Sequence, residues 1–260
     1  MDLGLKGKRA LVTGGSHGIG LATALALARE GCDVAVCSRT PERLSEASAK
    51  LNPLGRAVIA EACDVHSTEA ISAFCDRVTA AWGGVDILVN NVGGGGRWGK
   101  PSVEETDDRV WLEVFEKNAM AAVRFTVKFL PYMRAKKWGR VVNVTSRLGR
   151  EGGGRAWFNM AKAAQTSMMK TLGMDHQLAG DGITFNSVAP GDIMIPGTGW
   201  ETTMKSDPAA YKSYVSEACP IGRLGTAEEV ADVIAFICSE KAALVNGAAI
   251  AVDGGQSRAF

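Results

Sequence analysis

Glycines recur near the amino terminus, where the segment TGGSHGIG covers residues 13–20. Gly14, Gly18 and Gly20 follow the spacing GxxxGxG and lead directly into the helical pattern GLATALALARE. Glycine lets the backbone approach a pyrophosphate closely, and a helix N-terminus supplies free N–H donors and the positive end of a dipole. Because the turn lies at the first strand–helix junction of an alternating chain, it predicts a dinucleotide site. We assign to this site Gly14, Ser16, His17, Gly18, Ile19 and Gly20.

The end of the second apolar run, CSRT, indicates which nucleotide is bound. An acidic residue there would hold a ribose 2′-hydroxyl, whereas an arginine favours a 2′-phosphate. Ser38 and Arg39 occupy these positions, and the next acid is Glu42. The sequence therefore predicts NADP(H), with NAD(H) as the alternative. The rest of the adenosine and ribose wall is expected from Asp64, Val65, Asn90, Asn91 and Gly93, which follow the third and fourth runs.

Phe158 and Lys162 lie four residues apart in the segment GGGRAWFNMAKAAQ, residues 152–165. This spacing is one helical turn, so the lysine ammonium is predicted to lie under the ring. Hydride delivered to a carbonyl carbon leaves an alkoxide, which needs a proton donor or a positive field. A phenol, with an unperturbed pKa of ~10, becomes a usable acid beside an ammonium. Phenylalanine keeps the ring and lacks that titratable atom, so the proton source is in question.

The elements that must position these residues are short apolar runs alternating with longer amphipathic segments. The predicted strands are 9–14, 33–38, 57–65, 86–91, 139–146, 182–190 and 248–255. They are too short for helices and mostly apolar on both faces, as buried parallel strands are. The predicted helical segments include 18–30, 67–82, 108–136, 155–178 and 226–239. The alternation predicts an α/β fold with one Rossmann-like, doubly wound domain, in which helices flank both faces of a seven-stranded parallel sheet.

We place this single domain over residues 1–260, with the nucleotide-binding half at about 1–100 and the catalytic residues at about 101–260. Two segments depart from the alternation. NVGGGGRWG, residues 91–99, carries consecutive glycines that are too flexible for regular structure without a reason. Residues 192–224 form a long connection before the last helix and strand. Long ordered insertions often cover a site, so we expect a substrate lid at 192–224.

The order of these motifs resembles the short-chain dehydrogenase/reductase family, which includes the 3-oxoacyl-carrier-protein reductases. The motifs that carry the resemblance are KRALVTGGSHGIG, CDV, ILVNNVGG, VVNVTS, AKAA, NSVAPG, PIGRLGTAEEVADVIAFICSE and VDGGQS. They cover essentially the whole chain in the expected order. The resemblance implies a Rossmann-like fold and an oxidoreductase that transfers hydride to or from a carbonyl or alcohol carbon.

The family's catalytic asparagine, serine, tyrosine and lysine map by position to Asn118, Ser146, Phe158 and Lys162. The resemblance implies that the serine polarises the substrate carbonyl and that the asparagine holds a water in a proton relay. It also implies that the lysine holds the nicotinamide ribose and lowers the pKa of the tyrosine. The tyrosine, which gives or takes the proton, is replaced here by Phe158. Loss of a positioned acid–base group costs on the order of 100- to 10,000-fold in rate.

Three interpretations of Phe158 stay open. In the first, an engineered replacement of tyrosine has inactivated a carbonyl reductase or alcohol dehydrogenase. In the second, the natural enzyme works without a phenol, either on an imine or activated C=C substrate or with another proton source. The candidate sources are Ser146, a water on Lys162, Glu151 and Asp192. In the third, the chain is a pseudoenzyme that keeps NADP(H) binding as a sensor or scaffold.

The loop after the sixth predicted strand also departs from the family pattern. Pro190 and Gly191 match the family's Pro-Gly step, and Ile193 suits a backbone contact with the nicotinamide carboxamide. The family usually places a threonine about four residues after this step, where this chain has Ile195. Either the loop shifts to bring in Thr198, or that hydrogen bond is lost.

Arginine and tryptophan gather around the predicted pocket. The residues concerned are Arg97, Trp98, Arg147, Arg150, Arg155, Trp157 and Trp200. Arginine is the side chain best shaped for a carboxylate or phosphate. We therefore predict a small-molecule substrate with an anionic group bound by Arg97 or Arg147, beside an aromatic wall of Trp157 and Trp200. The alternative is that these arginines are exposed.

Composition limits the class of protein and the kinds of partner that we expect. At 260 residues, with 46% hydrophobic and 22% charged residues, the chain is long enough for one large soluble domain. A net charge of +1 gives no reason to expect nucleic acid or an acidic membrane as a partner. No apolar run reaches the roughly 18 residues of a membrane span, and the first 20 residues form no secretory leader, so we predict a cytoplasmic protein.

The six cysteines show no CxxC or CxxH spacing, so we predict buried free thiols rather than a metal site. Members of the family commonly assemble as tetramers through helices that correspond here to about 108–136, 155–178 and 226–252. The apolar content of these segments supports a homo-oligomer, either a tetramer or a dimer.

Overall fold

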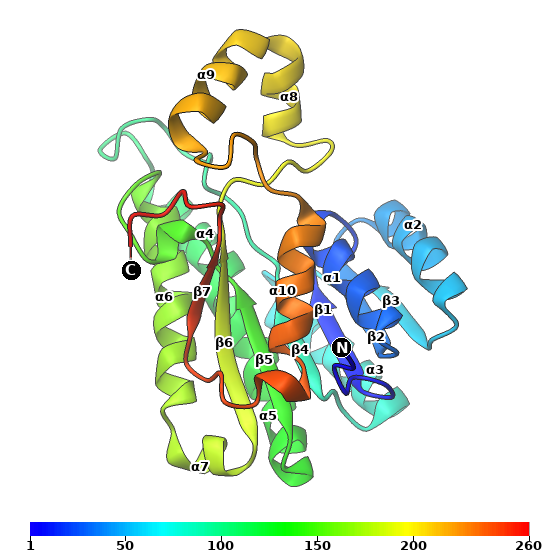
Figure 1. Ribbon diagram of the computed structural model, residues 1–260. Coiled ribbons are helices and arrows are strands. Elements are labelled where there is room, and N and C mark those ends of the chain that lie inside the picture. The colour runs from blue at the N-terminus through cyan, green and yellow to red at the C-terminus, as the bar shows by residue number, and fades with distance from the viewer. Residues whose placement is uncertain (260) are drawn as a thin grey trace.

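The seven predicted strands form one parallel sheet in the computed structural model, which describes residues 1–259 (Figure 1). The strands are β1 (Arg9–Thr13), β2 (Asp33–Ser38), β3 (Val58–Ala62), β4 (Ile87–Asn90), β5 (Gly139–Val144), β6 (Ile183–Pro190) and β7 (Ala249–Val252). Their order is β3-β2-β1-β4-β5-β6-β7, and neighbouring strands run parallel. The winding reverses between β1 and β4, which makes the carboxyl ends of these strands the expected ligand crevice. The predicted fold class is confirmed.

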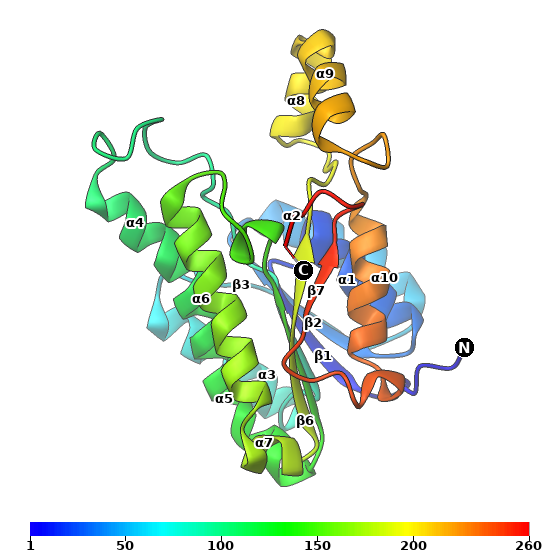
Figure 2. The same ribbon diagram turned by 60° about the vertical axis from the view of Figure 1, so that its left-hand side comes forward.

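Helices cover both faces of the sheet, as Figure 2 shows from the side. They are α1 (Gly18–Arg29), α2 (Pro41–Leu51), α3 (Thr68–Trp82), α4 (Asp108–Phe115), α5 (Ala121–Lys136), α6 (Ala156–Gly173), α7 (His176–Gly180), α8 (Gly199–Ser206), α9 (Pro208–Ala218) and α10 (Ala227–Ile237). Residues of α1, α2 and α10 share one apolar core, and residues of α3, α5 and α6 share the other. Neighbouring strand residues alternate between the two, since Val12 packs in the first core and Leu11 in the second.

The predicted helix over 108–136 is not continuous. A π-helical segment, Glu116–Met120, separates α4 from α5. Short π segments inside helices are frequent at functional sites, and this one carries Asn118. The predicted helix over 155–178 is likewise divided, because α6 ends at Gly173 and α7 begins only at His176.

The predicted lid, residues 192–224, contains two helices that the sequence analysis did not anticipate. In Figures 1 and 2, α8 and α9 stand together beyond the carboxyl ends of the strands. The carboxylate of Asp207 caps α9 by accepting a hydrogen bond from the Ala210 N–H at 2.9 Å. Neither helix contains a fully buried residue, so the apolar periodicity that would reveal them in the sequence is weak.

Two general expectations can be compared with the fold. All six cysteines, Cys32, Cys37, Cys63, Cys75, Cys219 and Cys238, are buried thiols, as predicted. None of the helices formed by residues 1–259 is long and apolar enough to cross a membrane.

Candidate active site

The glycine-rich turn is closely packed against its own backbone. Gly14 and Gly18 have φ values of +65° and +54°, which favour glycine over other residues. A Cβ at Gly20 would lie 2.3 Å from the Gly14 carbonyl oxygen. The Asn91 amide donates to the carbonyl oxygens of Thr13 at 2.9 Å and Gly14 at 3.3 Å. These contacts fix the turn between β1 and α1 against the residue that follows β4.

A cavity of about 270 Å³ lies beside this turn, and we call it the basic cavity. It is lined by Gly14, Ser16, His17, Ser38, Arg39, Thr40, Arg43, Cys63, Val65, Asn91, Val92, Gly93 and Lys117. No aspartate or glutamate is among these lining residues. Within residues 1–259, the cations Arg39, Arg43 and Lys117 form no ion pair with a carboxylate. Three uncompensated positive charges therefore converge on one cavity.

The titration of the lining residues reflects this charge. Burial lowers the pKa of Lys117, and the neighbouring Arg39 lowers it further. Burial also lowers the pKa of His17, with an additional contribution from Arg43. Like charges that line one cavity raise its electrostatic free energy, and an anion would relieve this repulsion.

The sequence analysis missed Arg43 and Lys117. Arg43 lies one turn into α2, and Lys117 lies in the π-helical segment, where no motif points to it. It also expected Asp64 in the adenosine and ribose wall, and this role stays a prediction. Asp64 is exposed and is not among the residues that line the basic cavity, and its carboxylate accepts a hydrogen bond from the His66 N–H at 3.1 Å.

A second cavity of about 480 Å³ adjoins the first, and we call it the catalytic cavity. It is lined by His17, Gly18, Ile19, Asn91, Gly93, Gly94, Val144, Thr145, Ser146, Arg147, Leu148, Phe158, Lys162, Pro190, Gly191, Asp192, Ile193, Ile195, Thr198 and Trp200. His17, Asn91 and Gly93 line both cavities, so one extended ligand can reach from the first into the second. The fold thus brings together residues from the ends of β1, β4, β5 and β6 with the lid.

Lys162 lies below the ring of Phe158, as the helical spacing predicts. Its Nζ is 5.7 Å from the ring centroid and donates to the Val144 carbonyl at 3.0 Å. It also donates to Oε1 of Gln165 at 2.9 Å. Burial lowers the pKa of Lys162 to about 7, with a smaller contribution from Lys117.

Ser146 ends the loop that follows β5. Its Oγ accepts a hydrogen bond from the Leu148 N–H at 3.1 Å, which starts the 3₁₀ turn Arg147–Gly149. A hydroxyl that accepts through its oxygen still has its hydrogen to donate. The side chain can therefore donate to a carbonyl oxygen in the catalytic cavity.

Asn118 does not line either cavity. Its Nδ2 donates to the carbonyl oxygens of Val114 at 2.7 Å and Gly94 at 2.9 Å, and its Oδ1 accepts from the Gly94 N–H at 3.1 Å. The amide thus holds the glycine segment beside Lys162. In this arrangement Asn118 fixes the cavity wall, and its predicted role in a proton relay stays a prediction.

Two of the predicted substrate residues lie elsewhere. Trp157 is fully buried and packs edge-on against Trp111, with ring centroids 5.5 Å apart. It is one residue from Phe158, so the helix turns it by about 100° away from the cavity, toward α4. Arg97 is exposed and lies 5.7 Å from the Trp200 ring centroid without lining either cavity. Only Arg147 and Trp200 line the catalytic cavity as predicted.

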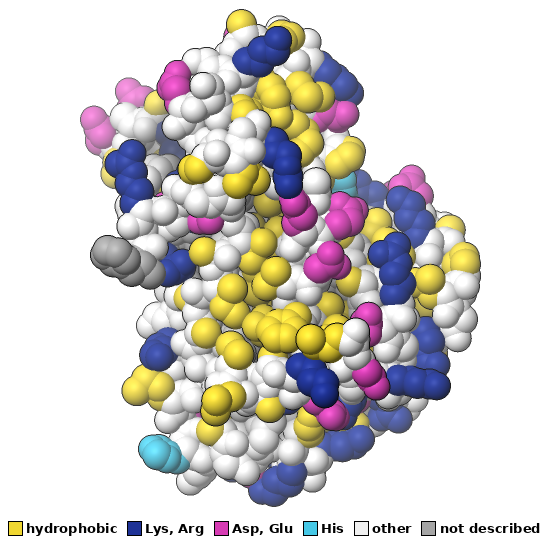
Figure 3. All heavy atoms as spheres, in the orientation of Figure 1, with side chains coloured by type: hydrophobic (Ala, Val, Ile, Leu, Met, Phe, Trp, Pro, Cys, Tyr) yellow, Lys and Arg dark blue, Asp and Glu magenta, His cyan; other side chains and the backbone are white. Residues whose placement is uncertain are grey.

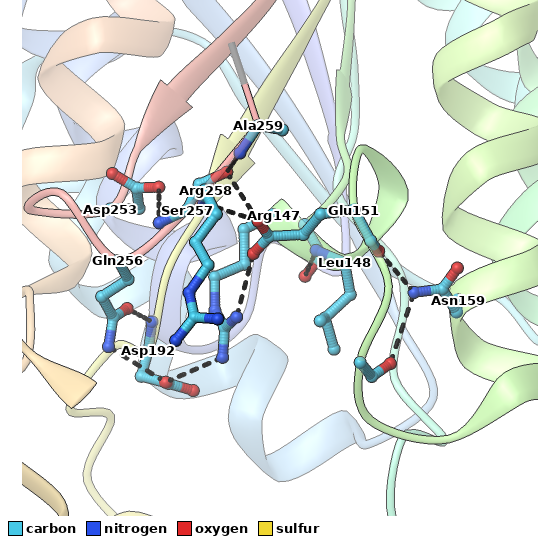
Figure 4. A network of polar contacts seen from close by, with 12 residues as sticks. Arg147, Leu148, Glu151, Asn159, Asp192, Asp253, Gln256, Ser257, Arg258 and Ala259 are labelled. Atoms are coloured by element: carbon cyan, nitrogen blue, oxygen red, sulfur yellow. Dashed lines mark hydrogen bonds and ion pairs between the residues drawn. The ribbon is translucent and has the colours of Figure 1, made fainter. Parts of the chain in front are cut away.

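Arg147 belongs to a polar network that the sequence did not reveal (Figure 4). Its guanidinium pairs with Glu151 at 3.1 Å and with Asp192 at 3.7 Å. Glu151 in turn accepts from the Arg258 N–H at 2.6 Å, and Asp192 accepts from the Gln256 amide at 3.2 Å. The wall next to Ser146 therefore contains a cation whose charge is already compensated.

The predicted lid, residues 192–224, is attached to the same network. The Tyr214 hydroxyl, from α9, donates to Asp192 at 2.5 Å, and its ring stacks on Trp200 with centroids 4.4 Å apart. Burial raises the pKa of Tyr214 to about 12, and its hydrogen bond to Asp192 adds to the shift. At neutral pH Tyr214 is therefore a protonated hydrogen-bond donor that ties the lid to the end of β6.

Comparisons with known proteins agree with this geometry. A protein-family model described as enoyl-(acyl carrier protein) reductase matches residues 14–257. The chain belongs to the short-chain dehydrogenase/reductase family. Within the family it is 35% identical to the uncharacterized oxidoreductase YvrD of Bacillus subtilis (strain 168), with 100% of both chains covered. It is 33% identical to the 3-oxoacyl-(acyl-carrier-protein) reductase FabG of Escherichia coli (strain K12), with 97% of this chain and 98% of the relative covered.

A solved structure of the family is also similar over its whole length. L-Sorbose reductase from Gluconobacter frateurii, complexed with NADPH and L-sorbose, superposes with a TM-score of 0.91 and 35% sequence identity, covering 100% of both chains. The chain described here is thus a short-chain dehydrogenase/reductase by sequence and by fold.

Proposed function

We propose that this protein transfers hydride between NADP(H) and a carbonyl or alcohol carbon of a small molecule. The observation that carries the proposal is the pair of adjoining cavities. One end is basic and contains no acidic lining residue, and the other brings Ser146 and Lys162 together at the end of the sheet. NADPH in the similar L-sorbose reductase structure supports the same assignment.

The residues present fit NADP(H). The packing of Gly20 against the Gly14 carbonyl leaves backbone room for a pyrophosphate at the start of α1. Arg39, Arg43 and Lys117 would hold a 2′-phosphate in the basic cavity. When bound, the reduced nicotinamide supplies the hydride. The chain itself must bind, orient and protonate the substrate.

Within the catalytic cavity, the Ser146 hydroxyl would donate to the substrate carbonyl oxygen and polarise it. The Lys162 ammonium, fixed by Val144 and Gln165, would place a positive charge beside the developing alkoxide. Phe158 contributes an apolar surface and no proton. The oxygen must therefore receive its proton from another group of this cavity.

The anionic substrate expected from the sequence has little support in this wall. Arg147 faces two carboxylates, Glu151 and Asp192, and Arg97 lies outside the cavity. We therefore propose an uncharged carbonyl compound that contacts Trp200 and hydrogen-bonds to the Arg147–Asp192 pair. The L-sorbose in the similar structure is uncharged.

Two alternatives are favoured by Phe158 itself. A chain without a phenol on the α6 face would serve as an NADP(H)-binding protein that does not catalyse. It would also suit a reductase of imines or activated C=C bonds, because hydride alone neutralises an iminium. Both alternatives keep the basic cavity, and they differ in whether the bound cofactor is used for a reduction.

We also propose that the protein is a cytoplasmic homo-oligomer. Figure 3 shows apolar side chains gathered on the face that carries α10 and β7. Phe236 of α10 is 40% exposed, and Leu244 after it is 98% exposed. An apolar face of this kind suits a second copy of the chain.

Binding and turnover together test the proposal. Titration with NADPH and NADH, followed by tryptophan fluorescence, should show NADPH binding about 10- to 100-fold tighter, because charged hydrogen bonds contribute about 1.5–3 kcal/mol. Initial rates are then measured on ketones, 3-oxoacyl thioesters, enones and cyclic imines. Equal binding of both cofactors contradicts the NADP(H) assignment. Tight NADPH binding without turnover on the whole panel would favour the binding protein.

A further inference from the structure

Within residues 1–259, one of the three protons of the Lys162 ammonium has no protein acceptor, and the side chain lies at the wall of the catalytic cavity. An ammonium carries three protons, and two of them are donated to the Val144 carbonyl and to Oε1 of Gln165. The side chain lines the cavity together with Phe158. A Cβ at Gly93, which also lines the cavity, would lie 2.9 Å from Nζ. The ammonium thus lies directly at the boundary of the cavity.

Gln165 is held in one orientation by this lysine. It is 1% exposed, and its Oε1 accepts from Lys162 at 2.9 Å. Within residues 1–259 its Nε2 has no hydrogen-bond partner. Rotating the amide would place its N–H donors against the ammonium, so the structure keeps the oxygen on Lys162 and leaves the nitrogen unsatisfied. An arrangement that leaves a buried donor unpaired points to a requirement at the lysine.

The charged groups around Lys162 favour release of its proton. Lys117, from the π-helical segment, opposes a second positive charge and lowers the pKa of Lys162 beyond the effect of burial. From the other elements, Arg147 and Asp192 line the cavity as partners of each other, and His17 lies at the start of α1. None of the contacts to Nζ is a carboxylate, so no ion pair holds its proton.

We propose that Lys162 is itself the proton donor to the substrate oxygen, directly or through one water, and that Gln165 positions its ammonium. This inference rests on the hydride transfer proposed above. Addition of hydride to the carbonyl carbon moves the π pair onto oxygen, and an O–H bond forms as an N–H bond of Lys162 breaks. The neutral amine then regains a proton from solvent. The unionisable ring of Phe158 borders this path without taking part in it.

The first test measures the lysine without turnover. A lysine-selective NMR titration follows the ammonium in the NADPH complex, with the Lys162 resonance identified by its loss in Lys162→Arg. Because burial lowers the pKa of Lys162 to about 7, we expect a midpoint near that value. A midpoint above about 9 would leave the lysine protonated at neutral pH and would overturn the proposal.

The second test measures reduction of a ketone that the unmodified chain accepts. Its rate should fall as the pH rises through the Lys162 midpoint, because the donor must be protonated. Lys162→Arg keeps the positive charge but holds its proton. It should bind NADPH within about tenfold of the unmodified chain and lose about 100- to 10,000-fold in rate. A rate within tenfold of the unmodified chain overturns the role of Lys162 and leaves the proposed function intact.

A matched pair at Gln165 separates positioning from packing. In the plot of rate against pH, the falling limb is the decrease in rate at high pH. The carboxylate of Gln165→Glu should pair with the ammonium and move this falling limb to higher pH, whereas Gln165→Leu should move it to lower pH. Variants that lose rate without moving the limb would assign Gln165 to packing only. His17→Gln should leave the midpoint of the limb in place. Loss of the limb in this variant would make the histidine the donor and overturn the proposal.

If the unmodified chain binds NADPH but reduces no compound of the panel, the proposed function and this inference are both overturned. That outcome differs from active Lys162→Arg, which contradicts this inference only.

Discussion

The basic cavity and the catalytic cavity share three lining residues but differ in whether carboxylates pair with the arginines that line them. In the basic cavity, Arg39 and Lys117 have no ion-pair partner within residues 1–259, so no carboxylate offsets their charges. In the catalytic cavity, Arg147 is compensated by Glu151 and Asp192. Lys162 there is buried against neutral oxygens. We propose that the charges at one end bind an anion and that the charge at the other end moves a proton.

The largest effect is expected from Phe158→Tyr, which tests this difference between the cavities. A hydroxyl above Lys162 would restore a positioned acid, so carbonyl reduction should rise by about 100- to 10,000-fold while NADPH affinity stays within a few-fold. Initial rates and fluorescence titration measure the two quantities. A rise of this size means that the phenol protonates the alkoxide faster than Lys162 does directly. If tyrosine adds nothing to an already active chain, donation from Lys162 is already fast enough. A change in NADPH affinity larger than the change in rate would contradict the division between the cavities.

Arg39→Asp tests whether the basic cavity selects the cofactor. A carboxylate at the end of β2 would repel a 2′-phosphate and accept a ribose hydroxyl, so the preference for NADPH over NADH should fall by about 100-fold or more, given about 1.5–3 kcal/mol per charged contact. Lys117→Met removes one cation without adding an acid and should lower the preference by about tenfold. The Kd values of NADPH and NADH for each variant give this preference. An unchanged ratio in both variants would show that these cations do not select the cofactor.

The two cavities also differ in how far the sequence predicts them. The glycine turn and Arg39 are local signals, since a strand, a tight turn and a helix start are contiguous in the chain. Residues predicted from these two signals lie together at the basic cavity in the structure, namely Gly14, Ser16, His17, Ser38 and Arg39. Lys117 was missed because it reaches the cavity from a π-helical segment far along the chain, where no spacing marks it.

In the catalytic cavity, the helical period placed Lys162 under Phe158 correctly, because both belong to one helix. The partners of Arg147 could not be predicted in the same way. Asp192 follows β6 and Gln256 lies near the carboxyl end, and only the sheet order brings them beside the end of β5. Trp157 was misplaced because sequence proximity to Phe158 does not specify which side of the helix a neighbour occupies.

Asp192→Asn tests the ion pair between Arg147 and Asp192 at the catalytic cavity, and it should have a smaller effect than the variants above. The variant removes the charge that faces Arg147 at 3.7 Å and keeps an acceptor for Tyr214. Because the pair is partly exposed, we expect a loss of about 0.5–1 kcal/mol in stability and about 1–4 °C in Tm. Thermal unfolding measures this, and KM for a carbonyl substrate should rise a few-fold as the lid loosens. Lys205→Gln, which breaks an exposed pair with Glu201 inside the lid, is the control and should change neither quantity.

The smallest effect is expected at Arg97, which the sequence placed among the substrate residues. Its guanidinium lies 5.7 Å from the Trp200 ring centroid, outside both cavities. An exposed cation over an aromatic ring contributes about 0.5–1 kcal/mol, so Arg97→Ala should change KM by less than about fivefold. Arg147→Met, measured in parallel, should change KM more, because it leaves Glu151 and Asp192 without their cation beside the substrate. The opposite result would be a larger change in KM for Arg97→Ala than for Arg147→Met, with a greater difference for anionic than for neutral substrates. That result would show that Arg97 binds an anionic group of the substrate and that the Arg147–Asp192 pair does not determine which substrate is accepted.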